Sequence, residues 1–204
     1  MEEKWIQHYS SCHEILLVGE GNFSFAASLA TAFGNASNMV ATSLDSPEML
    51  RINHPSSVSN LDLLEEKGCT IIHKVDACYM CEHPLLSHRK FDRIVFNFPH
   101  AGFYGPEHNA YQISLHQDVV RGFLKNAYEM VREEGEVHIT HKTSHPFSEW
   151  KIEELAAEVG FYLSEEVDFF IWDYPEYENK RGDGSRSDDT FPVGRCSTFK
   201  FSKN

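Results

Sequence analysis

The stretch Ile15-Leu16-Leu17-Val18-Gly19-Glu20-Gly21-Asn22-Phe23-Ser24-Phe25 decides the fold. Its apolar first part, ended by a glycine, is typical of a buried parallel strand. The Ala-rich segment from Phe25 to Phe33 predicts a helix. Glycine suits the connecting turn because a Cβ would block a close approach of the backbone to a ligand or forbid the φ angle. We therefore expect a strand, a ligand-binding turn and a helix.

Short β-type runs alternate with helical segments along the rest of the chain. We expect further strands over residues 39–44, 70–75, 91–98 and 136–141, and closing strands over 167–172 and 197–201. The expected helices are 61–67, a long one over 113–134 that ends at Gly135, and one that Ser148 caps and Gly160 ends. The polar, Gly-rich residues 173–194 predict a long surface loop. The alternation predicts an α/β fold with a mainly parallel seven-stranded sheet and helices on both faces.

Length and composition indicate one domain over residues 1–204, with its core at about 14–201. The hydrophobic share of 41% and the charged share of 24% exclude a mostly disordered chain. No apolar run is long enough for a membrane helix, and no signal peptide is expected. Five scattered cysteines favour free thiols in a reducing compartment, which predicts an intracellular protein.

The formal net charge is −13. Such a charge repels polyanions at long range, whereas a protein that binds nucleic acid without help and without sequence preference is expected to be basic. The charge therefore argues against autonomous nucleic-acid binding.

Polar groups follow the first three expected strands in an ordered way. The turn Gly19 to Ser24 follows the first, Asp45 ends the second, and Asp76-Ala77 ends the third. A carboxylate at Asp45 can accept hydrogen bonds from both ribose hydroxyls of an adenosine, and one at Asp76 can reach the adenine amino group. Ser24 stands where a dinucleotide fingerprint has its third glycine, which disfavours a pyrophosphate ligand. The set predicts a site for S-adenosylmethionine (SAM), with helix capping by the two Asp as the alternative.

A second motif, Asn97-Phe98-Pro99-His100, ends the fourth strand, where ligands bind in such sheets. In outline it is the Asn/Asp-Pro-Pro-aromatic motif of methyltransferases that act on nitrogen in planar systems. An acceptor there holds the target nitrogen in line with the sulfonium methyl group. His100 replaces the usual aromatic residue, and it can stack on a base or take a proton near neutral pH. The alternative is that Pro99 only ends the strand and His100 is an ordinary loop residue.

With these motifs, the chain resembles the eukaryotic large-subunit rRNA uridine-N3 methyltransferase family, in particular its short plant-type members. The resembling stretches are Ile15 to Phe25, His73 to Ala77, Phe91 to Gly102 and Tyr177 to Gly184, which together span most of the chain. The resemblance implies a class I SAM-dependent methyltransferase fold, SAM as cofactor and an RNA uridine as substrate. It also implies that the protein works in the cytoplasm or in the nucleus and nucleolus.

By position, the resemblance assigns Gly19, Gly21, Asn22 and Phe23 to the methionine end of SAM, and Glu20 and Ser24 belong to the same turn. It assigns Asp45 to the ribose, Asp76 and Ala77 to the adenine edge, and Asn97, Phe98, Pro99 and His100 to the target base. Phe98, Phe103 and Tyr104 are candidate stacking surfaces, and His141 is a candidate residue of the substrate cleft. Lys180 and Arg181, in the long loop, are candidate RNA contacts, and a basic protein partner or a ribosomal particle would supply the missing positive charge.

Two groups have metal-like spacing but do not complete a site. Cys78, Cys81 and His83 lack a second cysteine pair, and His141 and His145 form only a pair. Methyl transfer needs no metal, so we expect none.

Other functions are compatible with parts of the pattern. A methyltransferase acting on another RNA or on a small heteroaromatic molecule fits the acidic charge. A non-catalytic module of the same fold would have no need of Gly19, Asp45 and Asp76 together, and Ser24 disfavours a nicotinamide oxidoreductase.

Overall fold

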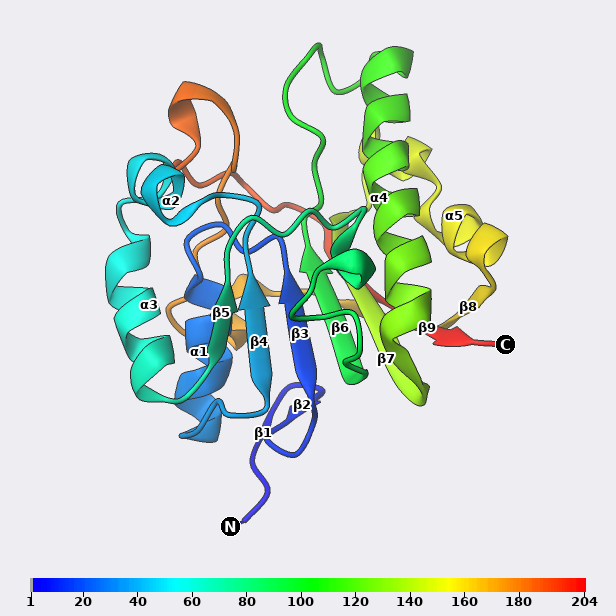
Figure 1. Ribbon diagram of the computed structural model, residues 1–204. Coiled ribbons are helices and arrows are strands. Elements are labelled where there is room, and N and C mark those ends of the chain that lie inside the picture. The colour runs from blue at the N-terminus through cyan, green and yellow to red at the C-terminus, as the bar shows by residue number, and fades with distance from the viewer. Residues whose placement is uncertain (1) are drawn as a thin grey trace. The chain divides into compact units, whose positions relative to one another are not determined.

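The computed structural model describes residues 2–204 (Figure 1). These residues divide into two compact units. The first unit contains the described residues up to Val75 together with Phe170–Val193. The second contains Asp76–Phe169 together with Gly194–Asn204. Each unit thus combines segments that are far apart in the sequence. The single domain expected over residues 1–204 stays a prediction.

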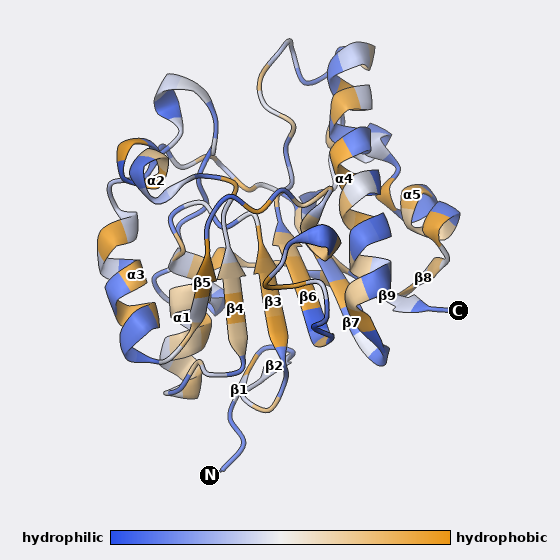
Figure 2. Ribbon diagram, in the orientation of Figure 1, coloured by the Kyte–Doolittle hydropathy of each residue, from blue (hydrophilic) through white to orange (hydrophobic). Residues whose placement is uncertain are grey.

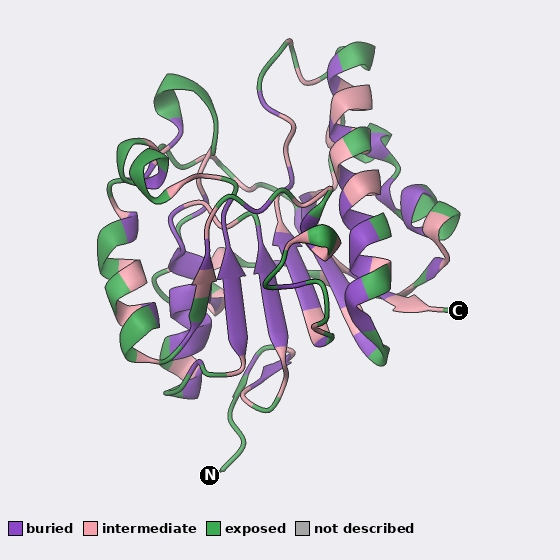
Figure 3. Ribbon diagram, in the orientation of Figure 1, coloured by how far each residue is buried: buried purple, intermediate pink, exposed green. Residues whose placement is uncertain are grey.

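The first unit is built on three parallel strands. The pairing joins Ile15 to Met39 and Val40 to Thr70. Figure 3 shows β3 (Ile15–Val18) and β4 (Met39–Thr42) as buried along their whole length. Strands buried on both faces are mostly apolar, as Figure 2 shows for these two. Its elements are β1 (Trp5–Ile6), β2 (Tyr9–Ser10), β3 (Ile15–Val18), α1 (Ser24–Phe33), β4 (Met39–Thr42), α2 (Pro47–Asn53), α3 (Ser57–Glu66), β5 (Thr70–Ile72), and the 3-10 turns η3 (Ile171–Asp173) and η4 (Gly184–Arg186).

The second unit contains both parallel and antiparallel pairs. Its elements are η1 (Met80–Glu82), β6 (Phe91–Asn97), α4 (Ala110–Met130), β7 (Val131–Lys142), η2 (Phe147–Trp150), α5 (Ile152–Val159), β8 (Phe161–Asp168) and β9 (Cys196–Lys203). Strand β6 runs parallel to β7, and β9 is antiparallel to both β7 and β8.

Seven strands form one sheet in the order β5-β4-β3-β6-β7-β9-β8. This mainly parallel seven-stranded sheet, with helices between its strands, confirms the predicted α/β fold class. In the described residues 2–204, no helix is both long and apolar enough to cross a bilayer.

Several expected boundaries were wrong. The long helix ends at Met130 instead of Gly135, because Val131 already pairs with Phe91 across a bulge. Gly135 lies inside β7, where an added Cβ would come within 3.0 Å of the Asp92 carbonyl oxygen.

Two later elements were also misplaced. Ser148 does not cap a helix: it belongs to the turn η2, and Lys151, with φ 55°, separates this turn from α5. The eighth strand is Phe161–Asp168 instead of 167–172, and residues 171–173 form the turn η3. This strand is mostly exposed, so it lacks the apolar run that identified the buried strands.

The polar interior of the second unit centres on Glu136. Its Oε2 accepts a hydrogen bond from Nε2 of the fully buried His138 at 2.7 Å, and Arg93 Nε lies 3.5 Å from the same oxygen. The hydrogen bond from His138 outweighs burial and lowers the pKa of Glu136 to about 2. The carboxylate therefore stays ionised at neutral pH and stabilises this part of the sheet.

We expect Glu136→Gln to lower the free energy of unfolding at pH 7 by about 1.5–3 kcal/mol, the contribution of a hydrogen bond to a charged group. A carboxyl whose pKa is lowered by folding stabilises above its unfolded pKa, ordinarily 4.5, and loses this effect as the pH falls toward 2. The difference between variant and wild type should thus be constant above about pH 5 and shrink below it. Denaturant unfolding at several pH values measures it.

The matched control is Glu133→Gln on β7. The exposed side chain of Glu133 pairs with Lys203 of β9. It should change the stability by less than about 0.5 kcal/mol. An effect of Glu136→Gln that does not depend on pH would show that charge at Glu136 is irrelevant.

Candidate active site

The turn after β3 is shaped by two backbone requirements. Gly19 has φ 65°, in the left-handed region that favours glycine, and it is exposed. Gly21 is required for a different reason, since a Cβ there would lie 3.2 Å from Cβ of Lys180. Asn22 closes the turn, because its Oδ1 accepts the N–H of Ser24 at 3.1 Å, and α1 begins at Ser24.

Glu20 is a buried carboxyl within this turn. Its Oε2 accepts the backbone N–H of Ala26, in the first turn of α1, at 3.3 Å. Burial raises the pKa of Glu20 to about 7, although this hydrogen bond opposes the shift. Both protonation states of Glu20 are thus accessible near neutral pH.

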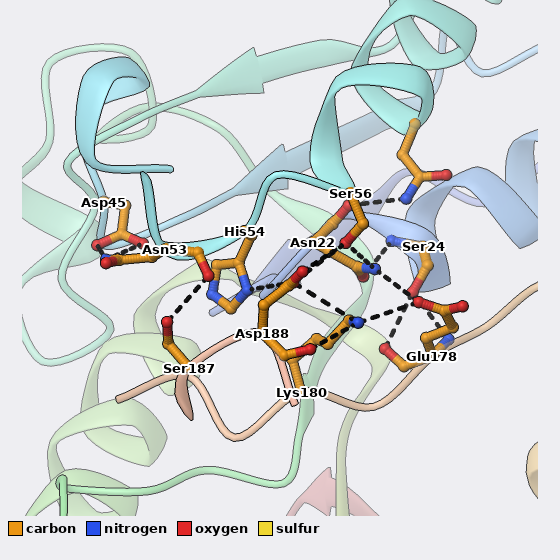
Figure 4. Close-up of polar contacts among 11 residues, drawn as sticks. Asn22, Ser24, Asp45, Asn53, His54, Ser56, Glu178, Lys180, Ser187 and Asp188 are labelled. Carbon is orange, nitrogen blue, oxygen red and sulfur yellow. Dashed lines mark hydrogen bonds and ion pairs between the residues drawn. The ribbon is translucent and has the colours of Figure 1, made fainter. Parts of the chain in front are cut away.

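Asp45 follows β4 and is half-buried. Both of its carboxylate oxygens lie 3.2 Å from Nδ2 of Asn53, at the end of α2 (Figure 4). Because β3 and β4 are parallel neighbours, Asp45 and the Gly19 turn follow the same ends of two adjacent strands. The carboxylate is therefore held in one orientation by a neutral donor.

Residues 173–194, expected to form a long surface loop, contain the turn η4, and part of this segment packs against the turn after β3. We call residues 178–188 the strap. Figure 4 shows Asp188 of the strap pointing toward Ser56, His54 and Lys180. Ser24 Oγ accepts the N–H of Glu178 at 2.9 Å and donates to its carbonyl oxygen at 3.1 Å. These two hydrogen bonds hold the strap against the turn that follows β3.

Lys180, expected to contact RNA, is a member of this network. Its side chain is 7% exposed, and Nζ lies 3.1 Å from Glu178 Oε2 and 2.9 Å from the Asp188 carbonyl oxygen. Its charge is therefore compensated within the unit. Arg181, the other expected contact, is half-buried, and its backbone N–H donates to the Asp189 carbonyl oxygen at 3.0 Å.

In the second unit, Asp76 forms a local turn. Its Oδ1 accepts the N–H of Cys78 at 2.8 Å, and its side chain is exposed, with Ala77 half-buried beside it. This contact belongs to a local turn and not to a helix cap, since the N-cap residue of η1 is Tyr79. The exposed side chain of Asp76 remains accessible to a ligand.

The Asn97 motif forms the end of β6. The N–H of Phe98, at φ 49°, donates to the Thr140 carbonyl oxygen at 2.7 Å, and Pro99 is buried. Among the described residues, Asn97 Oδ1 has no hydrogen-bond partner although it is buried. Backbone strain at Phe98 and an unused acceptor at Asn97 are features that functional sites often show.

His100 belongs to a group with Glu107 and His116. Nε2 of His100 lies 2.7 Å from Glu107 Oε1, and Nε2 of His116 lies 3.0 Å from Glu107 Oε2. Burial raises the pKa of Glu107, but the hydrogen bonds from the two histidines outweigh it and hold this pKa at about 2.

Sequence reasoning missed Glu107, Gln112 and His116. Gln112 accepts the N–H groups of Tyr104 and Gly105 and donates to the Gly102 carbonyl oxygen, so it holds the loop before α4. A signal existed, because Gln112 and His116 are polar residues four positions apart on the buried face of α4.

The expected substrate-side aromatic residues differ in accessibility. Phe103 and Tyr104 are 41% and 74% exposed, and Phe98 is half-buried against Phe169. His141 is 4% exposed; its ring packs on Trp150, and its Nε2 faces the Phe147 carbonyl oxygen. Burial lowers the pKa of His141 to about 4, so this ring is neutral.

The cysteine group is not assembled as a metal site. Among residues 2–204, the group with three potential ligand atoms within 4.8 Å of one another is His100, Glu107 and His116, without Cys78, Cys81 or His83. Cys78 packs on α4, where a Cβ at Gly122 would lie 2.5 Å from its Sγ. Burial raises the pKa of its thiol to about 11, which disfavours the thiolate that a metal requires.

Comparison with solved structures identifies the fold. It is similar to that of 1,6-didemethyltoxoflavin-N1-methyltransferase from Burkholderia thailandensis, solved with S-adenosylhomocysteine bound. The TM-score is 0.54 and the identity 13%, over 94% of this chain and 71% of that one. The predicted class I SAM-dependent methyltransferase fold is confirmed.

Two proteins of Arabidopsis thaliana are similar in sequence. An uncharacterized protein is 53% identical, over 100% of this chain and 99% of its own length. The heavy metal-associated isoprenylated plant protein 41 is 52% identical over 98% of this chain, which spans only 39% of that protein.

A more distant relative is the 25S rRNA (uridine(2634)-N(3))-methyltransferase of Saccharomyces cerevisiae, 24% identical over 88% of this chain and 68% of that protein. The BMT5-like family, described as rRNA (uridine-N3-)-methyltransferase BTM5-like, matches residues 16–181. Because this match covers most of the chain, the protein belongs to the BMT5-like family of methyltransferases.

Proposed function

We propose that this protein transfers a methyl group from SAM to N3 of a uridine in ribosomal RNA. The family to which it belongs and the yeast relative's described activity support this reaction. The observation that carries the proposal is Asn97 Oδ1, a buried acceptor without a partner at the end of β6. N3 of uridine carries a proton, and an imide N–H is a donor that such an acceptor can bind.

The residues around the first turn fit the cofactor. The exposed, left-handed Gly19 leaves backbone accessible, and the half-buried Asp45 keeps a fixed carboxylate that can accept ribose hydroxyls. We assign Gly19 to Ser24 to the methionine end, Asp45 to the ribose, and Asp76 and Ala77 to the adenine. When bound, SAM supplies an electrophilic methyl group on a sulfonium.

The chain itself has to orient the base and remove its proton. Asn97 binds the imide edge, and the exposed rings of Phe103 and Tyr104 offer stacking surfaces for a base that has left its helix. The leaving thioether is neutral, so no acid is needed for it, and positioning supplies most of the rate gain. His100, in the same loop, is the proposed proton acceptor.

Binding of RNA needs an additional contribution. With a net charge of −13 and Lys180 compensated internally, we propose that a basic partner or a ribosomal particle brings the substrate to this protein. Such a substrate places the protein in the cytoplasm or in the nucleus and nucleolus.

The direct test uses purified protein, labelled SAM and rRNA from cells that lack the modification. Mass spectrometry of the nucleosides should detect N3-methyluridine. Methylation of small heteroaromatic molecules, with no product in RNA or in ribosomal particles, would overturn the rRNA assignment.

We expect Asp45→Ala to weaken SAM binding by about 1.5–3 kcal/mol, because a charged acceptor of hydrogen bonds is lost. Calorimetric titration measures the Kd. Asp62→Ala, on the exposed face of α3, is the matched control and should bind SAM normally. If a folded Asp45→Ala variant binds SAM normally, Asp45 does not contribute to SAM binding and its side chain serves only the contact with Asn53.

Asn97→Ala should reduce turnover by about 10²-fold or more, because it removes the acceptor proposed to bind the N3–H of uridine. The affinity for SAM should change far less. Single-turnover rates and SAM Kd values are compared in the same preparation. Equal losses in both quantities would mean that Asn97 shapes the cofactor pocket.

Lys180→Ala should lower the free energy of unfolding by about 1.5–3 kcal/mol, because it removes a nearly buried cation that lies 3.1 Å from Glu178 and 3.6 Å from the half-buried Asp188. Arg186→Ala, with a 70% exposed side chain in the same strap, is the control and should cost less than about 1 kcal/mol. Thermal melts measure both. A stable Lys180→Ala protein with weakened RNA binding would restore Lys180 as an RNA contact.

A further inference from the structure

The position of the proton on His100 is determined by the backbone. Nδ1 of His100 accepts the N–H of Gly102 at 3.0 Å. A neutral imidazole carries one proton, so the His100 ring must carry it on Nε2, which faces the Glu107 carboxylate at 2.7 Å. Donor and acceptor are thus matched at both ring nitrogens of His100. His116 differs, because its Nε2 lies 3.0 Å from Glu107 Oε2 and also 3.0 Å from the amide donor Nε2 of Gln112.

This matching disfavours a metal ion between the three side chains. A metal bound at Nε2 would need the proton on Nδ1, where it would face a backbone N–H in each ring. Metal-binding histidines instead donate their other N–H to an acceptor. The arrangement is suited to moving a proton.

We propose that Glu107 is a positioning residue that holds His100 with its proton on Nε2, so that Nδ1 is the general base that removes the proton from N3 of uridine. This inference rests on the proposed function. His116 acts on the other carboxylate oxygen and keeps Glu107 in place. The same division of roles, in which a carboxylate fixes the tautomer of a catalytic imidazole, is known from hydrolase triads.

The step is balanced as follows. The N3–H bond breaks, and its proton goes to Nδ1 of His100, which gives up the hydrogen bond that it accepts from the N–H of Gly102. The electron pair left on N3 forms the bond to the methyl carbon, the carbon–sulfur bond breaks, and the sulfur keeps that pair as a neutral thioether. The imidazolium is stabilised by the Glu107 carboxylate and later releases its proton to water.

The surroundings favour this transfer. The titratable groups that contact His100 are Glu107 and His116 from α4. His141 of β7, which interacts with both of these groups, is neutral because of its burial. Glu107 is therefore the negative charge that compensates the imidazolium. The centroid of the Phe103 ring lies 4.3 Å from that of the His100 ring, so Phe103 covers one side of the His100 imidazole.

The test compares Glu107→Gln with wild type on two RNAs, one with uridine and one with 5-fluorouridine. In the variant, the amide N–H donates to Nε2 and favours the proton on Nδ1, where it occupies the base position. We expect the methylation rate on uridine to fall by about 10²–10⁴-fold, the usual contribution of a general base. The SAM Kd should be unchanged.

Fluorine withdraws electrons and makes the N3–H more acidic, so a substrate that ionises more readily depends less on the base. The defect of Glu107→Gln should therefore be at least about tenfold smaller on 5-fluorouridine RNA, and it should also shrink as the pH is raised. Glu107→Asp keeps the charge and should recover part of the methylation rate. If Glu107→Gln does not fold, the comparison is made with Glu107→Asp instead. Glu134→Gln, on the exposed part of β7, is the matched control and should behave as wild type.

The outcomes separate the two hypotheses. If wild type forms N3-methyluridine and a folded Glu107→Gln is fully active, or loses the same factor on both RNAs at every pH, Glu107 does not position a base. If wild type methylates another atom or another substrate, the proposed function fails and this inference fails with it.

Discussion

The site in the first unit depends on the reversal of the chain at Gly19. β3 is buried along its whole length, so the chain can meet a ligand only where the strand ends and turns. The left-handed φ at Gly19 makes the reversal, and a Cβ at Gly21 would lie 3.2 Å from the Cβ of Lys180, a tight contact. A side chain at Gly19 would strain the backbone, and one at Gly21 would require Lys180 to shift by a few tenths of an ångström.

Backbone donors have a comparable effect in the second unit. The N–H of Gly102 determines which nitrogen of the His100 imidazole carries the proton, and the resulting Nε2–H faces Glu107. Gln112 keeps this backbone in place through the Gly102 carbonyl oxygen. The chemistry of His100 is therefore a property of the whole loop between β6 and α4, including residues that no substrate needs to contact.

How far the sequence predicts this structure depends on burial. β3, β4 and β6 were predictable because strands buried on both faces are continuous apolar runs. β8, whose residues are mostly exposed, was placed six residues too late, and α4 was extended by four residues into β7. Those boundaries depend on pairing partners, such as Phe91 for Val131, that periodicity alone does not identify.

The same distinction applies to the site. Gly19, Asp45 and Asn97 were candidates because each lies at the carboxyl end of a strand that the sequence predicts. The strap was assigned to a loop, but Asp188 of the strap contacts His54 and Ser56, which are more than a hundred positions away in the sequence. Glu107 became visible only once the loop brought it between two histidines.

Charge pairing inside the units bears on how this protein meets a polyanion. Lys180 lies against Asp188, Arg93 against Glu136, and Lys200 against Glu165 at 2.6 Å. Such pairs stabilise the fold but contribute little field beyond about 8–10 Å, the screening length at physiological salt. The long-range field is therefore that of the remaining negative charge, which would slow the approach of any polyanion. For the RNA substrate proposed above, selection of a nucleotide would have to come from short-range contacts to the base, for which Asn97, Phe103 and Tyr104 are the proposed residues, since attraction of the phosphates cannot supply it.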